Sequence, residues 1–399
     1  MPTLLQINVT ANWGSTGKIS EQIGVVAQKH GWDSYIAYGR HMNPSRNKLI
    51  KIGTKINVYL HYIESRFFDN EGLASRIATR SFLKVIDKIK PDLVHLHNIH
   101  DHYLNYRILF EYLNRYDIPV VWTFHDCWAF TGHCFHFVTK KCERWKVECY
   151  DCPLKNECPK TFLDKSKDHY NLKRDLFCNC KNLTIVPCSD WMYSFVQQSF
   201  LKNKRIQVIH NGIDLNVFKP LSSQYRSNRN KFNVLAVSNV WNVGKGEIDI
   251  YKLRSILNED EYEIIMVGLS VDQVEKLPAG IVGIQRTQNL NELVQLYSHA
   301  DVLINPTYAD TFPTINIEAL ACGTPVITYE TGGSPEAVDE KTGIVIEQGN
   351  IDALVEAIKQ MKEKLFSSID CRKRAEENFD KDKCFKKYID LYESIIKNI

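Results

Sequence analysis

The chain has 399 residues, of which 44% are hydrophobic and 24% are charged. This length fits two to three domains, and this composition excludes a disordered, collagen-like or low-complexity chain. The formal net charge of +3 excludes a strongly polyelectrolyte protein, and we expect no nucleic-acid partner. No apolar run approaches the roughly 18 residues that span a bilayer, and the first residues lack the features of a signal peptide. We therefore expect a cytoplasmic protein.

Strands and helices are predicted to alternate along the first 210 residues. Apolar runs predict strands at 3–9, 34–38, 92–96, 119–124, 183–186 and 206–209. Helical spacing of apolar residues predicts helices at about 18–30, 74–90, 103–115, 165–180 and 191–201. The alternation pauses at 126–164, a Cys-rich and Lys-rich insert without a clear period. Such alternation predicts a parallel sheet covered by helices.

A second alternating series follows the polar run 222–230, which we interpret as a linker. Strands are predicted at 232–237, 262–267, 281–284, 302–305 and 325–328, and helices at 246–257, 290–299, 314–321, 351–365 and 380–398. The predicted fold class is α/β, with two Rossmann-like, doubly wound parallel sheets facing a central cleft. We expect domains at 1–210 and 211–379, with the terminal segment 380–399 packing back on the first.

Two features of the first domain are candidates for ligand binding. The loop with Gly14 and Gly17 opens a helix, where glycines permit close approach and the helix N-terminus favours an anion. It is not a Walker P-loop, because Asn12 and Ile19 replace the required glycine and Ser/Thr, and a turn without a ligand stays an alternative. His125 follows a strand, where it can hydrogen-bond a sugar hydroxyl or relay a proton.

A histidine pair suggests another class of protein. His95 and His97 share one face of a strand, and such a pair can bind a metal in a hydrolase. Later strand ends offer no coherent set of further ligands, so buried or cleft histidines are the favoured interpretation. The hydrolase hypothesis predicts activity that is lost with chelators and on His95→Ala or His97→Ala.

The most informative motif is DTFPTINIEALACGTP at 310–325. Asp310 is predicted in a loop, and Glu318 lies in the helix that follows. Backbone amides near Thr314 and Ile315 would form the N-terminus of that helix, which attracts anions. A ligand that presents a phosphate to the helix and hydroxyls to both acids fits this layout, and a nucleotide sugar is such a ligand. Lys245, at a helix start after a strand, is placed to pair with a diphosphate.

These residues resemble the E-x7-E signature of retaining glycosyltransferases of family 4 (GT4), which have the GT-B fold. The resemblance covers nearly the whole chain, including residues 14–19, 91–97, 123–126, 211–214, 245–246 and 332–336. The motifs GSTGK at 14–18, HNIH at 97–100 and HDCWAFTGHC at 125–134 are similar to the colanic-acid-type exopolysaccharide branch. The resemblance implies hexosyl transfer from a nucleotide-diphosphate sugar to a saccharide or lipid-linked saccharide with retention, in bacterial exopolysaccharide, capsular or O-antigen synthesis.

The resemblance also implies how the donor nucleotide is held. Glu318 would accept hydrogen bonds from the ribose hydroxyls. Lys245 would pair with the diphosphate, and the amides of Thr314 and Ile315 would meet phosphate. The arginine that the family carries five residues before the lysine is Val240 here, and the neighbouring Asn239 would compensate in part.

Further roles are implied around the donor sugar. Asp310, with the amides of Thr311 and Phe312, would hold the sugar. His125 would reach the sugar from the first domain, and the loop 14–17 would approach the phosphate or the acceptor. Asp310 stands where the family has glutamate and is one methylene shorter. Pro313 stands where the family often has glycine and removes one amide donor.

The implied mechanism is a front-face reaction in which the leaving phosphate helps to deprotonate the acceptor. No side chain is placed as an enzymic nucleophile, and no cofactor is required for catalysis. The departures from the family pattern leave an alternative open, a non-catalytic GT-B protein that binds nucleotide sugars. The basic excess in the first 200 residues is compatible with an ordinary solvated surface, a phosphorylated substrate or peripheral contact with the cytoplasmic membrane face.

Cysteines gather in the first domain, where nine of the 12 lie between 127 and 188. A reducing compartment disfavours disulfides, so metal ligation or buried thiols are the main alternatives. The spacing in the insert is compatible with a tetrahedral structural zinc. The predicted ligands are Cys134, Cys142, Cys149 and Cys152, with Cys158 as an alternate.

Overall fold

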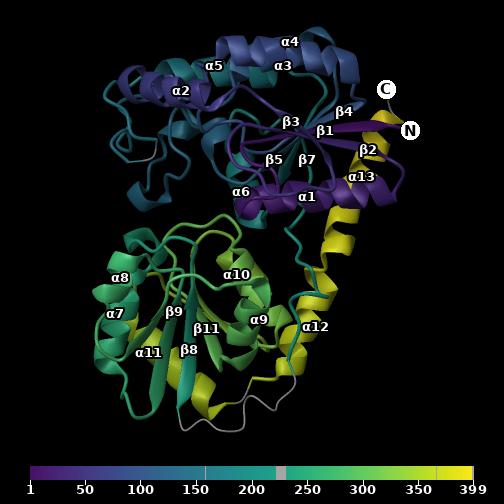
Figure 1. Cartoon of the computed structure of the whole chain (residues 1–399). Helices are drawn as coiled ribbons and strands as arrows, with labels where there is room; N and C mark the ends of the chain where they lie inside the picture. The colour runs from purple at the N-terminus through teal and green to yellow at the C-terminus, as the bar shows by residue number, and fades with distance from the viewer. Residues whose placement is uncertain (158, 222–230, 365, 398–399) are drawn as a thin grey trace. The chain divides into compact units, whose positions relative to one another are not determined.

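The computed structural model describes residues 1–157, 159–221, 231–364 and 366–397. The predicted linker 222–230 and the alternate ligand Cys158 lie outside the described residues. The chain divides into two compact units, one formed by residues 1–210 and 385–399 and the other by residues 211–384 (Figure 1). Each unit is an α/β structure, as its alternating pattern predicts.

The first unit contains a seven-stranded parallel sheet in the order β3-β2-β1-β4-β5-β6-β7. The strands are β1 (Thr3–Asn8), β2 (Asp33–Tyr38), β3 (Lys48–Lys51), β4 (Leu93–Leu96), β5 (Val120–Phe124), β6 (Leu183–Pro187) and β7 (Arg205–Ile206). The sheet grows in one direction from β1 and in the other from β4, so the loops after these two strands diverge at a topological switch point.

Helices cover both faces of this sheet (Figure 1). One face carries α2 (Lys55–Phe68), α3 (Arg76–Ile89), α4 (Tyr106–Arg115) and α5 (Ser166–Cys178); the other carries α1 (Gly14–Lys29) and the end of α13 (Lys381–Ile396). The short α6 (Asp190–Val196) follows β6. Every residue of β5 is buried, because a strand covered on both faces needs no polar side. Tyr388 and Tyr392 of α13 are buried within this unit.

The second unit contains a six-stranded parallel sheet in the order β10-β9-β8-β11-β12-β13. Its strands are β8 (Phe232–Val237), β9 (Tyr262–Val267), β10 (Ile281–Ile284), β11 (Val302–Asn305), β12 (Val326–Tyr329) and β13 (Gly343–Ile346). Its helices are α7 (Glu247–Ile256), α8 (Val271–Glu275), α9 (Leu290–His299), α10 (Thr314–Ala321), α11 (Ile351–Glu363) and α12 (Ser368–Asn378). The switch point lies between β8 and β11.

Local sequence explains where several helices begin. The side chains of Asn105, Ser189, Asn289 and Asn350 each accept a hydrogen bond from an amide in the first turn of the helix that follows. Helix α10 is different, because Pro313 occupies its N-cap and makes no such bond. The first amides of α10 therefore lack a side-chain cap and are available to another acceptor.

The observed elements refine the sequence predictions. The strands at 232–237, 262–267, 281–284 and 302–305 and the helices at 290–299 and 314–321 have the predicted bounds. The predictions missed β3, α2, α8, β13 and α12, and the helix predicted at 191–201 ends at Val196. The strand predicted at 206–209 is the short β7 instead. The insert contains three short 3-10 helices, η1 (Trp128–Phe130), η2 (Val138–Lys140) and η3 (Arg144–Lys146).

Helix α2 escaped prediction because apolar side chains occur on its exposed side as well as its packed side. Ile56, Tyr59, Leu60, Phe67 and Phe68 are all exposed. An apolar side chain on both sides of a helix obscures the helical period. Across the described residues, no helix combines the length and the apolar character needed to cross a membrane.

Candidate functional site

The switch point of the second unit brings Lys245 and Asp310 together. Lys245 ends η5 (Val243–Lys245) after β8, and Asp310 lies in the loop after β11. The Lys245 Nζ atom lies 2.7 Å from the Asp310 Oδ2 atom, and both side chains are partly exposed. Lys245, predicted to bind the diphosphate, and Asp310, predicted to bind the sugar, thus form an ion pair with each other. A phosphate that binds Lys245 must share or displace the carboxylate.

Backbone contacts hold these two loops against each other. The Tyr308 amide donates to the Gly244 carbonyl at 2.9 Å, and the Thr307 hydroxyl donates to the same oxygen at 3.4 Å. Gly246 has a φ of +76°, and a Cβ atom there would lie 2.2 Å from the Pro306 carbonyl oxygen. Only glycine allows this approach, so Gly246 lets Lys245 reach Asp310.

The loop before α10 supplies donors and one unsatisfied hydroxyl. The Phe312 amide was predicted to donate a hydrogen bond to the sugar. In the structure it donates to the Asp310 Oδ1 atom at 3.2 Å. The Thr311 Oγ1 atom is buried and has no hydrogen-bond partner. Buried hydroxyls are rarely left unpaired, which makes Thr311 a candidate for a ligand contact. Thr314 and Ile315 begin the helix as predicted, behind the uncapped N-terminus.

Glu318 is held by a residue that the motif did not reveal. The hydroxyl of Tyr297, on α9, donates to the Glu318 Oε2 atom at 2.9 Å. Burial raises the pKa of Tyr297 well above its usual value, so this hydroxyl stays a donor at neutral pH. The bond fixes the direction of the Glu318 carboxylate. Asn239 lies exposed in the loop after β8.

Gly332 is a further residue of this site that was not predicted individually. Its φ is +59°, and a Cβ atom there would lie 1.6 Å from the carbonyl oxygen of Asp310. The loop after β12 therefore packs directly on the backbone of the acidic residue. A glycine two residues before the sequence Ser334-Pro335 is the only signal that could have found it.

In the first unit, His125 belongs to a chain of hydrogen bonds with a fixed direction. The Gln6 Nε2 atom donates to the Ser20 carbonyl at 2.9 Å, so the Gln6 Oε1 atom faces the His97 Nε2 atom at 3.1 Å and must accept its proton. The His97 Nδ1 atom lies 3.1 Å from the His125 Nε2 atom. If His97 is neutral, its Nδ1 atom accepts and the His125 Nε2 atom donates.

Burial favours the neutral form of both rings. Burial lowers the pKa of His97 well below its usual value, and burial also lowers the pKa of His125 to about 4. With the proton on its Nε2 atom, neutral His125 carries a lone pair on Nδ1. The predicted sugar-binding histidine is therefore an acceptor for a hydroxyl at neutral pH.

Charged groups near His125 are paired with one another. The His100 Nε2 atom lies 2.8 Å from the Asp126 Oδ2 atom. Burial would raise the pKa of Asp126, but His100 and the Trp128 amide lower it to about 2.

In the loop after β4, Asp101 and His102 have φ values of 79° and 71°, which is unusual away from glycine. His102 contacts Glu71 at 2.8 Å, and this buried pair anchors the strained loop.

The two glycines of the loop before α1 differ in their surroundings. Gly14 has a φ of +67° and nothing within 4 Å of an added Cβ atom, so its role is conformational. Gly17 would place a Cβ atom 2.6 Å from the Thr10 Oγ1 atom, so it permits close packing. The Asn8 side chain donates to the Thr10 carbonyl at 2.9 Å and fixes the loop after β1.

The metal-hydrolase hypothesis does not fit the contacts of the histidine pair. The His95 Nε2 atom lies 2.8 Å from the Thr123 hydroxyl, and its Nδ1 atom lies 2.6 Å from the Tyr392 hydroxyl. Both ring nitrogens of His97 are engaged by Gln6 and His125. With all four nitrogens in side-chain hydrogen bonds, the pair has structural and orienting roles.

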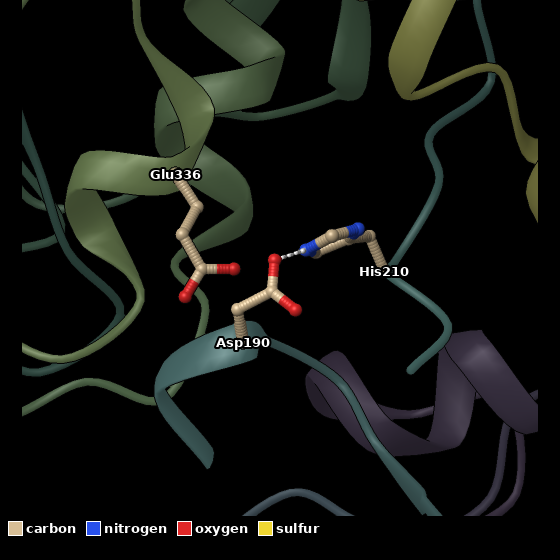
Figure 2. Close-up of side chains that lie close together, drawn as sticks. All are labelled: Asp190, His210 and Glu336. Atoms are coloured by element: carbon tan, nitrogen blue, oxygen red, sulfur yellow. Dashed lines mark ion pairs between the residues drawn. The ribbon is translucent and has the colours of Figure 1, made fainter. Parts of the chain in front are cut away.

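A further acid–histidine contact lies at the end of the first unit. The Asp190 Oδ2 atom, at the start of α6, is 3.9 Å from the His210 Nε2 atom (Figure 2). Glu336, also drawn there, belongs to the second unit. Asp190 is largely exposed, so this long ion pair contributes little to stability.

Two Rossmann-like units in tandem define the GT-B fold, and comparisons with known proteins agree. The sucrose-phosphate synthase of Thermosynechococcus elongatus matches all of this chain and all of its own with a TM-score of 0.77 and 16% identity. Anabaena Alr3699/HepE, solved in complex with UDP, matches 99% of this chain and 100% of its own with a TM-score of 0.67 and 14% identity.

The sequence places the chain in a family. Residues 22–217 match the family described as Glycosyltransferase Family 4, and residues 231–364 match Glycosyl transferases group 1. The chain belongs to these glycosyltransferases. WcaC of Escherichia coli strain K12, which carries the name of a colanic acid biosynthesis glycosyl transferase, is 23% identical over 98% of this chain and 100% of its own length.

Proposed function

We propose that the chain transfers a hexosyl group from a nucleotide-diphosphate sugar to a saccharide or lipid-linked saccharide, with retention, in exopolysaccharide, capsular or O-antigen synthesis. The observation that carries this proposal is the Lys245–Asp310 pair at the switch point of the second unit. A cation, a carboxylate and the uncapped N-terminus of α10 suit a phosphate ester of a sugar. The name of the relative WcaC supports the placement in exopolysaccharide synthesis.

The ion pair suggests how donor binding organises the site. The diphosphate takes Lys245 as its counter-ion, which releases the Asp310 carboxylate to accept a hydrogen bond from a sugar hydroxyl. The bond from the anomeric carbon to the phosphate oxygen then breaks, and Lys245 and the α10 amides stabilise the leaving charge. The acceptor oxygen bonds to the same face of that carbon, and its proton passes to the leaving phosphate. Positive charge comes from the protein, so the proposed reaction needs no metal.

Glu318 and its Tyr297 partner serve the nucleotide in this proposal. Tyr297 holds one carboxylate oxygen, and the ribose hydroxyls donate to the carboxylate. We expect Glu318→Ala to weaken nucleoside-diphosphate-sugar binding roughly 10- to 100-fold, because a hydrogen bond to a charged group contributes about 1.5–3 kcal/mol. Titration calorimetry against a panel of nucleotide sugars measures this, and Glu356→Ala, on an exposed turn of α11, is the matched control.

Three results would count against parts of this proposal. Equal donor affinity of Glu318→Ala and the wild-type protein would refute the assignment of the donor site. The configuration of the product, read from the anomeric coupling constant by NMR, tests retention, and an inverted product would refute the front-face mechanism. Donor binding without transfer to any saccharide or lipid-linked acceptor would favour the non-catalytic alternative.

We also propose peripheral contact of the first unit with an anionic membrane. The exposed apolar side chains of α2 support this, and so does a basic row on α3, which lies on the same side of the sheet (Figure 1). Four exposed basic residues recur at intervals of four and share one face of α3. They are Arg76, Arg80, Lys84 and Lys88. Apolar insertion and basic residues together suit a surface of anionic lipid.

Vesicle co-sedimentation tests this contact. We expect binding to vesicles that contain phosphatidylglycerol and little binding to pure phosphatidylcholine. The double variant Arg80→Gln/Lys84→Gln removes two charges, each contributing about 1 kcal/mol near such a surface, and should weaken binding roughly 30-fold. Lys359→Gln/Lys362→Gln, in the second unit, is the charge-matched control. Equal binding of both double variants would refute the contact through α3.

A further inference from the structure

Four cysteine side chains of the insert line one cavity in the first unit. They are Cys134, Cys142, Cys149 and Cys152. The cavity measures about 10 Å³, which is close to the smallest space that holds one water molecule, and Phe137 and Trp145 form part of its wall. All four cysteines are free thiols in the structure. A small cavity surrounded by four thiols offers room for one ion and little else.

Hydrogen bonds already single out two of these sulfur atoms as acceptors. The Gly132 amide donates to the Cys149 Sγ atom at 3.2 Å, and the Leu154 amide donates to Cys152. The side chains of Cys134 and Cys152 interact with each other. A Cβ atom on Gly132 would lie 2.7 Å from the Cys149 Cβ atom, so the glycine is needed for this approach. The bond from Gly132 holds the Cys149 sulfur atom in place at the wall of the cavity.

A buried lysine lies beside the cavity. Lys173 of α5 is fully buried, and its Nζ atom donates to the carbonyls of Trp128 and Thr131 at 2.7 and 3.1 Å. The same atom lies 3.5 Å from the centre of the Trp128 ring. Thr131 is itself part of the cavity wall. These contacts hold the segment that leads to Cys134 against α5.

The insert also has little else to stabilise its conformation. Between β5 and α5 the described chain forms only three short 3-10 helices, although loops of this length are uncommon in compact domains. A structural metal is a frequent way to stabilise such an irregular segment.

From these observations we infer that the insert binds one Zn²⁺ ion through Cys134, Cys142, Cys149 and Cys152. Zinc prefers four thiolates in a tetrahedron. In the described residues, no three of these sulfur atoms lie within 4.8 Å of one another. Binding therefore turns the side chains of Cys142 and Cys149 toward the Cys134–Cys152 pair, inside the cavity that all four line. The site belongs to the first unit and serves the conformation of the segment after His125.

Elemental analysis of the full chain, purified under reducing conditions without chelators, tests this inference. We expect about one zinc per chain, less than a tenth of that in Cys149→Ser and in Cys152→Ser, and the wild-type content in Cys178→Ser. Cys178 is an exposed thiol outside the cavity and is the matched control. Replacement of zinc by Co²⁺ in the wild-type protein should give the intense visible absorption of a tetrahedral thiolate site.

The wild-type measurements decide the matter even if a variant fails to fold. A zinc content near zero, with no Co²⁺ spectrum after reduction and addition of the metal, would overturn the inference. Fewer than 12 titratable thiols in the denatured, unreduced protein would indicate a disulfide in place of the metal site. Zinc that persists in both Cys149→Ser and Cys152→Ser would place the metal elsewhere.

Discussion

The switch points of the two units share a topology but differ in their chemistry. In the second unit a partly exposed cation and carboxylate face each other, beside an uncapped helix N-terminus. In the first unit the corresponding place holds buried neutral imidazoles whose protons are fixed by Gln6. The difference is one of electrostatics, because one site offers two charges to a ligand in our proposal, whereas the other offers neutral hydrogen-bonding groups in a set direction.

The largest expected effect comes from removing the charge of the second site. Lys245→Ala should lower kcat/KM roughly 100- to 1,000-fold, about 3–4 kcal/mol, because the leaving diphosphate loses its counter-ion. Steady-state kinetics measure this, with Lys359→Ala on an exposed turn of α11 as the control.

Salt provides an independent check on the same residue. The donor KM of the wild-type protein should rise with ionic strength, since partly exposed charges are screened, and this rise should be smaller in Lys245→Ala. A Lys245→Ala enzyme with wild-type kcat/KM and an unchanged salt dependence would contradict the proposed contact with the diphosphate.

A second test of the difference between the two units uses the charged histidine His102 of the first unit. Burial would lower the pKa of His102, but hydrogen bonds to Asp101 and Glu71 raise it to about 9. A raised pKa stabilises the fold fully below the unfolded value of 6.5, and the contribution is lost as the pH rises toward 9. The free energy of unfolding should therefore fall by up to about 3 kcal/mol from this group between pH 6.5 and 9.5.

His102→Gln isolates that contribution. The difference in unfolding free energy between the wild-type protein and His102→Gln, from denaturant titrations of the first unit's transition, should shrink across this pH window. A pH-independent difference for His102→Gln would show that the contact with Glu71 does not raise the pKa of this histidine.

The sequence predicted most of the second unit because its elements are regular. Strand β8 and helix α10 have the predicted bounds, since their apolar runs end at clear turn residues. Helix α2 was missed because apolar side chains on its exposed side obscure the helical period of the packed side. The edge strand β3 was missed because only its central residues are even partly buried.

Candidate site residues were predictable where a local motif carried them. Asp310 lies in a loop and Glu318 lies in the helix that follows it directly, so their spacing indicated a common ligand. The ion pair between Lys245 and Asp310 joins residues 65 positions apart, and no spacing rule predicts it. The same holds for Tyr297 with Glu318, because a single tyrosine on an amphipathic helix looks like an ordinary core residue.

The smallest expected effect comes from reversing the direction of the hydrogen bond between His97 and His125. Gln6→Met removes the acceptor of the His97 Nε2 proton while keeping a side chain of similar size. The His97 proton can then move to Nδ1, which faces the His125 Nε2 atom and forces its proton to the other nitrogen. His125 would lose the lone pair that accepts a hydroxyl, and kcat should fall roughly 10-fold with little change in the donor KM.

Ser20→Ala is the matched control, because the Ser20 carbonyl that orients Gln6 belongs to the backbone and is retained. The ¹⁵N chemical shifts of the two imidazoles report the tautomer directly, so a His125 ring that keeps its Nε2 proton in Gln6→Met would contradict this relay even if kcat falls.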